Sequence, residues 1–353
     1  MSNLNFSYLL LSTFRKTSMV YLRGLIFLSL IVPCSVSFVL AQGSPSSSSV
    51  NSGVAQSYPN RTVKIIGPAA GSVADLTVRI VAKYLSKVWK QSVIVENKPG
   101  AGGSIGTGFV VNADPDGYTL LVQSASFAAN PAIYKKLPYD PGKTLVDIDI
   151  LGVTPYALVV HPDGPYKSIK DLVSAAKTRP GDLSYASAGV GSSTHLAAEF
   201  FNQFAGIKLL NIPYKGSPDA LTDIMAGRSA FYMAPLDAAI GQIKSSKLKA
   251  LGVTSKTRAD ILSDVPTIAE QGFANFEINL WVGFWAPIAT PLAIVEKINT
   301  DLGKAMQDPE VKDSYAKAGI QSRHMDLDTV KKFVSSEIVK YQQIATKAGI
   351  EPQ

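Results

Sequence analysis

From Tyr58 to the C-terminus, the sequence alternates short apolar runs with segments of helical periodicity, and this alternation limits the possible folds. The run TVKIIG at 62–67 predicts a strand, and apolar residues three or four apart over 73–89 predict an amphipathic helix. Such alternation is typical of helix-covered parallel sheets. A body of about 300 residues is expected to split into two such units. Further strands are predicted at 92–96, 118–124, 156–161, 183–188, 208–214, 229–235 and 248–254.

A leader precedes this body. Residues 24–41 are uncharged and apolar, Arg23 stands before them, and Val39-Leu40-Ala41 places small residues where a signal peptidase cuts. We therefore expect a signal peptide over residues 1–41, a Ser-rich linker over 42–57 and an exported product in the periplasm.

Two other interpretations of the leader remain. The first is an uncleaved membrane anchor, since an apolar run of this length nearly spans a bilayer. Pro33 and the small residues near the end of the run favour cleavage instead. A lipoprotein site at Cys34 is disfavoured because Pro33 stands where a small residue is needed, and the apolar run continues past the cysteine.

Cysteine and charge exclude several classes of protein. Cys34 is the only cysteine and lies in the leader, which excludes disulfide scaffolds and thiolate metal sites from the mature chain. The three histidines show no metal-ligand spacing, so we expect no metal and no cofactor. The net charge is +7, and the leader carries three positive and no negative charges, which leaves 7 − 3 = +4. This mild excess does not predict nucleic-acid binding, and it suits a small anionic ligand.

Ligands of open α/β sheets bind at the carboxyl ends of strands, so the strand-to-helix loops are the candidate sites. The first loop follows residue 67. Ser72 is suited to cap the next helix, and Asp75 stands three residues on, as in a capping box. Either these residues only start the helix, or the loop amides also attract a carboxylate. The candidates here are Ala70, Gly71, Ser72 and Asp75.

A glycine-rich loop over 97–106 supports a rival function. It is neither a Walker loop nor a dinucleotide fingerprint, but residues 102–106 match G-x-S-x-G. A secreted serine hydrolase could use Ser104 with His195 or His324. We disfavour this alternative, because a nucleophile elbow is a tight turn and seven residues separate the predicted strand from Ser104.

The remaining loops offer hydroxyls, glycines and one acid. The loop before the helix expected near residue 193 combines four hydroxyls with two glycines, which makes an anion cradle. His195 falls in the first helical turn, where a capping or packing role competes with ligand contact. The candidates from these loops are Ser124, Ser126, Ser187, Gly189, Ser192, Ser193, Thr194, His195, Tyr214 and Asp237.

Several stretches resemble one family. VENKPGAGGSIGT (95–107), DPDGYTLL (114–121), YASAGVGSSTHLAAEFF (185–201) and VPTIAEQG (265–272) are similar to the periplasmic substrate-binding proteins of tripartite tricarboxylate transporters, the Bug (TctC-like) family. The resemblance implies a type II periplasmic-binding-protein fold of the α/β class. Its two lobes each carry a helix-covered, mostly parallel sheet and enclose a ligand cleft.

The resemblance also implies boundaries. The chain is expected to cross between lobes near Pro155 and Val253. Lobe 1 then comprises residues 58–155 and 254–353, and lobe 2 comprises 156–253.

The resemblance further implies a receptor rather than an enzyme. Its expected partners are a small organic carboxylate and the permease subunits of a membrane transporter, and it is expected to be a monomer. The ligand could be a citrate-like or dicarboxylic acid, an acidic amino acid or an aromatic acid. The loop after the first strand and the 189–194 loop would hold a carboxylate, and Trp281 would lie near the cleft.

The sequence departs from the family pattern in the first loop. Ala69 and Ala70 replace prolines, and Ser72 replaces a glycine. These departures leave the identity of the ligand open. A third interpretation, the effector-binding half of a transcriptional regulator, is disfavoured because no helix-turn-helix precedes residue 58.

Overall fold

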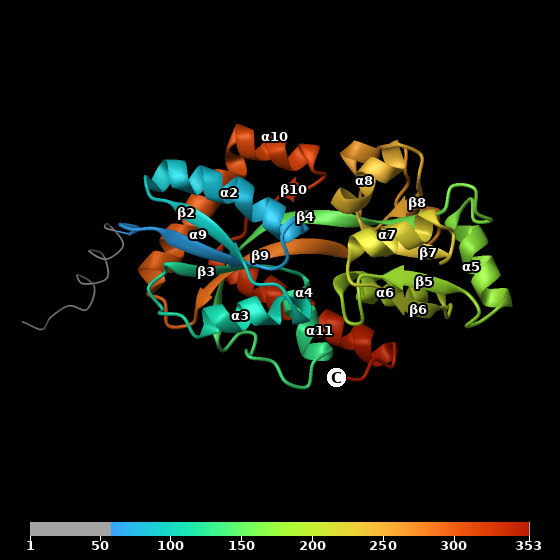
Figure 1. Ribbon diagram of the computed structural model, residues 1–353, viewed down its shortest axis with the longest axis horizontal. Coiled ribbons are helices and arrows are strands. Elements are labelled where there is room, and N and C mark those ends of the chain that lie inside the picture. Colours follow the sequence, from blue (N-terminus) through green and yellow to red (C-terminus); the bar gives the residue numbers. More distant parts are fainter. Residues whose placement is uncertain (1–57, 353) are drawn as a thin grey trace, which may run out of the picture. The chain divides into compact units, whose positions relative to one another are not determined.

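The structure is a computed structural model that describes residues 58–352, so the expected signal peptide and linker lie outside the described residues. The described chain is α/β (Figure 1). Its strands form one mixed sheet in the order β2-β1-β3-β9-β4-β7-β5-β6, with β8 and β10 both paired to β4. No helix within residues 58–352 has the length and apolar character needed to cross a membrane.

Lobe 1 is built on three parallel strands, β1 (Val63–Gly67), β2 (Val93–Asn97) and β3 (Thr119–Ser124). Helix α2 (Val73–Trp89) joins β1 to β2 and has the bounds that its periodicity predicts. Its apolar stripe is buried on the sheet, and Ser72 caps it by accepting a hydrogen bond from the Asp75 amide. The other elements of this part are η1 (Ala101–Gly103), α3 (Ser104–Val111), α4 (Ser126–Ala129) and η2 (Asn130–Ala132).

Two antiparallel strands, β4 (Leu145–Val160) and β9 (Asn279–Pro287), run between the lobes (Figure 1). β4 pairs with β9 as far as Pro155, and from Tyr156 onward it pairs with β7 and β8. The change of partner therefore falls at a proline, which cannot donate a ladder hydrogen bond. The sequence predicted only the last part of β4, because Asp149, which is fully buried, interrupts the apolar pattern of its first part.

Lobe 2 repeats the parallel arrangement with β5 (Ser184–Ser187), β6 (Leu210–Pro213) and β7 (Phe231–Pro235), and β8 (Lys249–Val253) is antiparallel to β4. The parallel pairing expected from the sequence is thus present in both lobes. The sequence predicted mostly parallel sheets and did not predict the antiparallel pair β4 and β9 between the two lobes. Which strands pair with each other depends on residues far apart in the sequence. The helices of this lobe are α5 (Ile169–Thr178), α6 (Ser193–Ala205), α7 (Ser217–Met225) and α8 (Leu236–Lys244).

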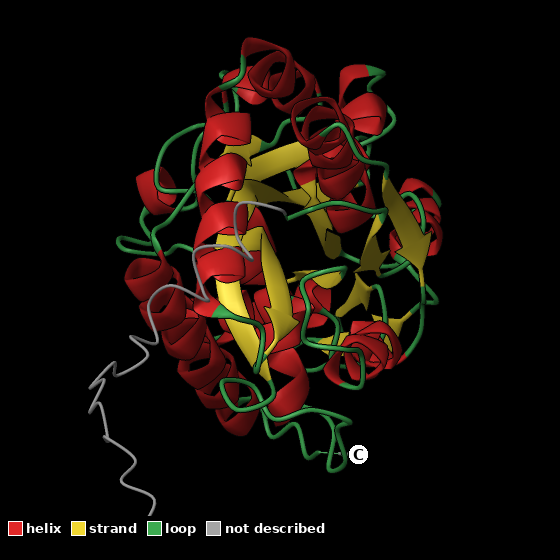
Figure 2. Cartoon of the chain, turned by 90° about the vertical axis from the view of Figure 1, so that its left-hand side faces the viewer, coloured by secondary structure: helices red, strands yellow, loops and turns green. Residues whose placement is uncertain are grey.

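The segment after β8 first forms η3 (Asp260–Leu262) and η4 (Ala269–Gln271). Beyond β9, the chain forms the C-terminal elements of lobe 1, which are α9 (Leu292–Gln307), α10 (Pro309–Lys317), β10 (Gln321–Ser322) and α11 (Leu327–Lys347). Helices lie on both sides of the strands (Figure 2). α11 packs on α4 and β4 and also reaches α6, where the Gln203 side chain donates a hydrogen bond of 2.8 Å to the Ile344 carbonyl. α11 is therefore a further link between the lobes.

The sequence predicts a second crossing near Val253, and aromatic contacts bear on where it falls. Phe276 stacks on Phe200 of α6 at 5.2 Å and packs edge-on against Phe201. Residues after Val253 therefore still pack on lobe 2. We propose that the first crossing is at Pro155 and the second at Asn279, where β9 begins.

Candidate functional site

The carboxyl ends of the parallel strands in both lobes approach the crossing strands. Pro235, at the end of β7, pairs with Tyr156, the first residue after the crossing. Ser124, at the end of β3, pairs with Val282, and Val282 also pairs with Gly152 of β4. The carboxyl ends of β3 and β7 therefore both lie beside the strands that run between the lobes, a region that we call the junction; ligands of α/β sheets bind at such strand ends.

The structure brings the residues predicted for the site to elements around this junction, although their roles in binding stay predictions. Ala70, Gly71, Ser72 and Asp75 follow β1; Ser124 and Ser126 follow β3; Ser187, Gly189, Ser192, Ser193, Thr194 and His195 end or follow β5; Tyr214 follows β6; Asp237 follows β7; and Trp281 lies on β9.

The α6 loop, residues 188–192, is held by its own hydroxyls. Thr194 Oγ1 accepts a 2.9 Å hydrogen bond from the Ala188 amide, and Ser192 Oγ accepts one of 3.2 Å from the His195 amide. Among the hydrogen bonds of the described chain, none has the amide of Val190, Ser193 or Thr194 as its donor. These amides stand at the N-terminus of a helix of 13 residues, where an anion is stabilised.

His195 supports this loop. Its Nδ1 accepts a hydrogen bond of 3.0 Å from the Gly191 amide, and its side chain is buried. Burial lowers the pKa of His195 to about 4, so the imidazole is neutral at pH 7 and its proton is on Nε2. The structure thus gives His195 a local structural contact.

The α6 loop also touches lobe 1. Gly191 has φ +74°, and a Cβ placed on it would lie 2.2 Å from Cγ2 of Ile133, just after η2. Only a glycine fits at this distance. The two lobes are therefore in contact at one side of the predicted cleft.

The α2 loop, residues 68–72, follows β1 in lobe 1. Ala69, Ala70 and Gly71 are exposed. No amide of Ala70, Val73 or Ala74 donates a hydrogen bond to another described residue. α2 thus offers unpaired amides at its N-terminus, as α6 does.

The Asp75 carboxylate has a structural role. Its carboxylate is buried and accepts hydrogen bonds from the Gly71 amide at 2.9 Å, Arg79 Nε at 3.0 Å and Asn97 Nδ2 at 2.8 Å. Burial alone would raise the pKa of Asp75, but the bonds from Arg79, Asn97 and Gly71 hold it below its ordinary value. Its carboxylate orders the loop rather than pointing to a ligand.

Three other predicted residues also have partners. Ser124 and Ser126 hydrogen-bond each other at 3.3 Å, and both are partly exposed. The Tyr214 hydroxyl donates to Asp223 Oδ1 at 2.5 Å, and this hydrogen bond is the largest cause of the raised pKa of Tyr214. Of these residues, the two serines keep the freer hydroxyls.

Trp281 is fully buried, and its indole N–H donates a hydrogen bond of 2.9 Å to Glu337 Oε2 on α11. Its ring borders a cavity of about 270 Å³ whose lining also includes Val153 and Phe333. Trp285 is equally buried and donates to Asp147 at 2.6 Å. Both tryptophans thus have well-defined packing.

Sequence reasoning missed two tyrosines at the junction. Tyr156 and Tyr232 are fully buried on β4 and β7. The Tyr232 hydroxyl shares a hydrogen bond of 2.8 Å with Ser217 Oγ, whereas the Tyr156 hydroxyl has no partner among the described residues. Both tyrosines lie in apolar runs, and this pattern is typical of core strands. The one available signal was the place of Tyr156 directly after the predicted crossing.

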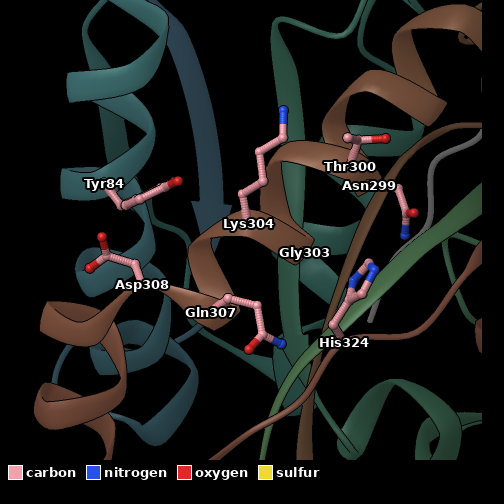
Figure 3. A pocket seen from close by; sticks show the side chains of 8 residues that line it. All are labelled: Tyr84, Asn299, Thr300, Gly303, Lys304, Gln307, Asp308 and His324. Carbon is pink, nitrogen blue, oxygen red and sulfur yellow. The ribbon is translucent and has the colours of Figure 1, made fainter.

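A larger cavity of about 620 Å³ lies elsewhere, against α2 and α9 (Figure 3). His324 lines it, and its Nδ1 lies 2.7 Å from Asp149 Oδ2. A Cβ on Gly303 would lie 2.7 Å from the His324 ring, so this packing requires a glycine. The hydrogen bond to Asp149 is the main cause of the raised pKa of His324. None of the residues predicted for the site lines this cavity.

The rival catalytic arrangement is not assembled. The Ser104 hydroxyl donates to the Ala101 carbonyl, and Ser104 is buried. Neither His195 nor His324 hydrogen-bonds Ser104 in the described chain. No group of three or more potential metal-ligating side chains occurs within residues 58–352.

Known proteins share this sequence and this fold. A protein of Pseudomonas sp. strain P51, called "UPF0065 protein in tcbD-tcbE intergenic region", is 34% identical over 81% of this chain and 86% of its own length. The solved structure of Rpa4515 of R. palustris with adipate has 30% identity and a TM-score of 0.78, covering 84% of this chain and 100% of that one.

A second solved structure, MatC of Rhodopseudomonas palustris with bound malate, has 27% identity and a TM-score of 0.73, covering 81% of this chain and 99% of that one. The model of the family described as "Tripartite tricarboxylate transporter family receptor" matches residues 77–350. The match confirms the resemblance of the quoted segments, and the chain belongs to the TctC family of tripartite tricarboxylate transporter receptors.

Proposed function

We propose that this chain is the receptor that captures a small organic carboxylate between its two lobes and delivers it to a tripartite tricarboxylate-type permease. One observation carries the proposal: α2 of lobe 1 and α6 of lobe 2 each begin just after a parallel strand, and each has N-terminal amides without a hydrogen-bond partner among the described residues. Relatives with bound adipate and malate support the same ligand class.

Helix N-termini suit this task physically. Their amides stabilise a carboxylate without burying a counter-charge, which would have to be desolvated in the empty receptor. Closure of the lobes would exclude water and strengthen each contact. The Gly191–Ile133 contact joins the α6 loop to lobe 1, so closure would have to keep or tighten this contact.

Export, a monomeric state and the absence of catalysis belong to the same proposal. A receptor of this family works outside the cytoplasmic membrane, which fits cleavage of the leader after Ala41. Mass spectrometry of the exported chain should find an N-terminus at Gln42. An intact leader in the membrane fraction would contradict cleavage.

Ligand binding is tested by a thermal-shift screen of the mature chain with linear dicarboxylates, hydroxy acids, acidic amino acids and aromatic acids. A true ligand at 100 times its Kd should stabilise the chain by about 2.7 kcal/mol. The control is the uncharged diamide of the same skeleton. Equal stabilisation by the diamide, or none by any acid, would contradict carboxylate capture.

The hydrolase alternative has its own test. Wild type and Ser104→Ala are compared in an esterase assay with a generic activated ester. We expect no turnover above background in either protein. Turnover that is lost in Ser104→Ala would overturn the receptor proposal in favour of catalysis.

A further inference from the structure

The cavity of about 620 Å³ against α2 and α9 is lined by polar side chains from several elements of lobe 1. Figure 3 shows Tyr84 of α2 at one side, His324 at the other, and side chains of α9 between them. None of the residues proposed for carboxylate capture lines this cavity. Any ligand that it holds would therefore be a second one, bound away from the junction.

The neutral side chains of the cavity offer hydrogen-bond donors. Among the described residues, the hydroxyls of Tyr84 and Thr300 have no hydrogen-bond partner. Gln307 Oε1 accepts a hydrogen bond of 2.8 Å from Lys312 Nζ, so its amide N–H groups remain for another partner. Hydroxyl and amide donors of this kind suit the oxygens of an anion.

Lys304 brings a positive charge to the cavity. Its Nζ lies 3.2 Å from Asp301 Oδ1, but Lys297 Nζ already lies 2.9 Å from the other oxygen of that carboxylate. The indole N–H of Trp89 donates to the same oxygen as Lys297, at 2.8 Å. Two lysines therefore face one carboxylate, which leaves a surplus of one positive charge. Asp301 is buried and Lys304 is exposed, so the surplus lies on the side of the cavity.

His324 adds a second cation when it is protonated. Its Nδ1 lies 2.7 Å from Asp149 Oδ2, which places a proton on Nδ1 and leaves Nε2 for another partner. The hydrogen bond with Asp149 raises the pKa of His324 against the effect of burial, and Asp326 adds to the rise. A Cβ on Gly303 would lie 2.7 Å from Nε2, so this atom lies against α9 one residue before Lys304.

Asp308 is the only carboxylate among the residues that line the cavity. Its Oδ1 caps α10 by accepting hydrogen bonds from the amides of Glu310 at 2.9 Å and Val311 at 3.1 Å. The N-terminus of α10 offsets its negative charge. With His324 protonated, the balance of charge in the cavity is therefore positive.

We propose that this cavity binds a tetrahedral oxyanion with two negative charges, which is the chemistry of a phosphate group. Lys304 and His324 supply the opposite charges, and Tyr84, Thr300 and Gln307 donate to the remaining oxygens. A phosphate group suits these residues better than a carboxylate does, because its greater charge and its additional oxygens can use both cations and several donors. The inference does not depend on carboxylate capture at the junction.

The first test is calorimetry of the mature chain with inorganic phosphate at pH 7 and constant ionic strength. We expect saturable binding that Lys304→Gln weakens by about 3- to 10-fold, since the ion pair is exposed and partly screened. Lys297→Gln is the matched control, because Lys297 pairs with the same carboxylate from the same helix but does not line the cavity. It should change the affinity by less than about 2-fold.

The second test uses sulfate, which keeps both charges from pH 6 to pH 8. Sulfate should bind about 3- to 10-fold more tightly at pH 6, because His324 loses its proton as the pH rises. The titratable groups around His324 are Asp149 on β4, Asp326 in its own segment, Lys304 on α9, Asp308 before α10 and Tyr84 on α2. His324→Gln should remove the pH dependence, and His161→Gln should keep it, since His161 does not line the cavity.

A phosphate group can come from a free ion or from a lipid headgroup, and vesicles distinguish the two. Co-sedimentation with phosphatidylglycerol but not with phosphatidylcholine, lost in Lys304→Gln, would assign the site to a lipid. Its absence would assign the site to the free ion. No saturable phosphate binding by wild type, or equal binding by Lys304→Gln, would overturn the inference and leave the receptor function standing. Lys304→Gln decides the question if His324→Gln fails to fold.

Discussion

The α2 loop of lobe 1 and the α6 loop of lobe 2 have similar backbones and different surroundings. Gly71 in the α2 loop and Gly191 in the α6 loop have φ angles of +73° and +74°. A Cβ on Gly71 would meet nothing within 4 Å, whereas one on Gly191 would collide with Ile133 across the junction. The α2 loop is therefore exposed on its own lobe, and the α6 loop takes part in contact between the lobes.

The aspartates after β1 and β7 differ in the same way. Asp75 is buried with three hydrogen-bond partners, and Asp237 keeps an oxygen with none. Both stand in the first turn of a helix, where an acid is favoured by the helix dipole. The comparison teaches that an acid in the first turn of a helix can be fully hydrogen-bonded in one lobe and keep an oxygen without a described partner in the other.

The largest effect is expected from alanine at the two glycines. Both variants incur the strain of a positive φ, about 1–2 kcal/mol. Gly191→Ala must also displace Ile133, so it should hold the lobes apart and weaken ligand binding by about 10- to 100-fold more than Gly71→Ala does. Calorimetry measures the affinity, and solution scattering measures the radius of gyration with ligand. Equal effects of the two variants would break the distinction between the loops.

The pH dependence of stability should separate the two aspartates. The folded pKa of Asp237 is raised from 3.8 to about 6, so its ionisation destabilises the fold as pH rises from 4 past 6, on the order of 2–3 kcal/mol. The pKa of Asp75 is lowered, so its contribution is present above pH 4 and is lost on acidification. Urea unfolding of wild type, Asp237→Asn and Asp75→Asn from pH 4 to 8 gives the two difference curves. Curves of the same slope would contradict the comparison.

Removal of single hydroxyls should give a smaller effect. Ser72→Ala removes a helix cap and should lower stability by about 1 kcal/mol with little change in affinity. Ser193→Ala removes a hydroxyl that caps nothing and should lower affinity by about 10-fold with little change in stability. Denaturation and calorimetry on both variants provide the measurements. The reverse result would move ligand contact from the α6 loop to the α2 loop.

The smallest effect is expected in fluorescence. A ligand should change the intrinsic signal saturably, and Trp281→Phe should remove most of the change, because Trp281 lies on β9, one of the strands that run between the lobes, and borders a cavity. Trp89→Phe is the control, since Trp89 ends α2 and donates to Asp301 away from the junction. A change that survives in Trp281→Phe would assign the signal to Trp285.

Local sequence predicted much of this fold and of the site. The periodicity of 73–89 predicts α2, and the hydroxyl at Ser72 and the acid at Asp75 mark its start, because helix starts depend on residues within one turn. The predicted strand-to-helix loops are present in the structure, because side-chain periodicity and turn residues act over short distances.

Tertiary structure alone decided the rest. The antiparallel pairing of β4 with β9, the contact of Gly191 with Ile133 and the stacking of Phe276 on Phe200 all join residues far apart in sequence. The sequence by itself determined the elements and placed acids and hydroxyls at their ends. Which acid is paired, as Asp75 is, and which is left free, as Asp237 is, depends on the side chains that packing brings near. The burial of a side chain and its hydrogen bonds to other residues are properties of the folded chain, since a carboxylate in the unfolded chain is surrounded by water.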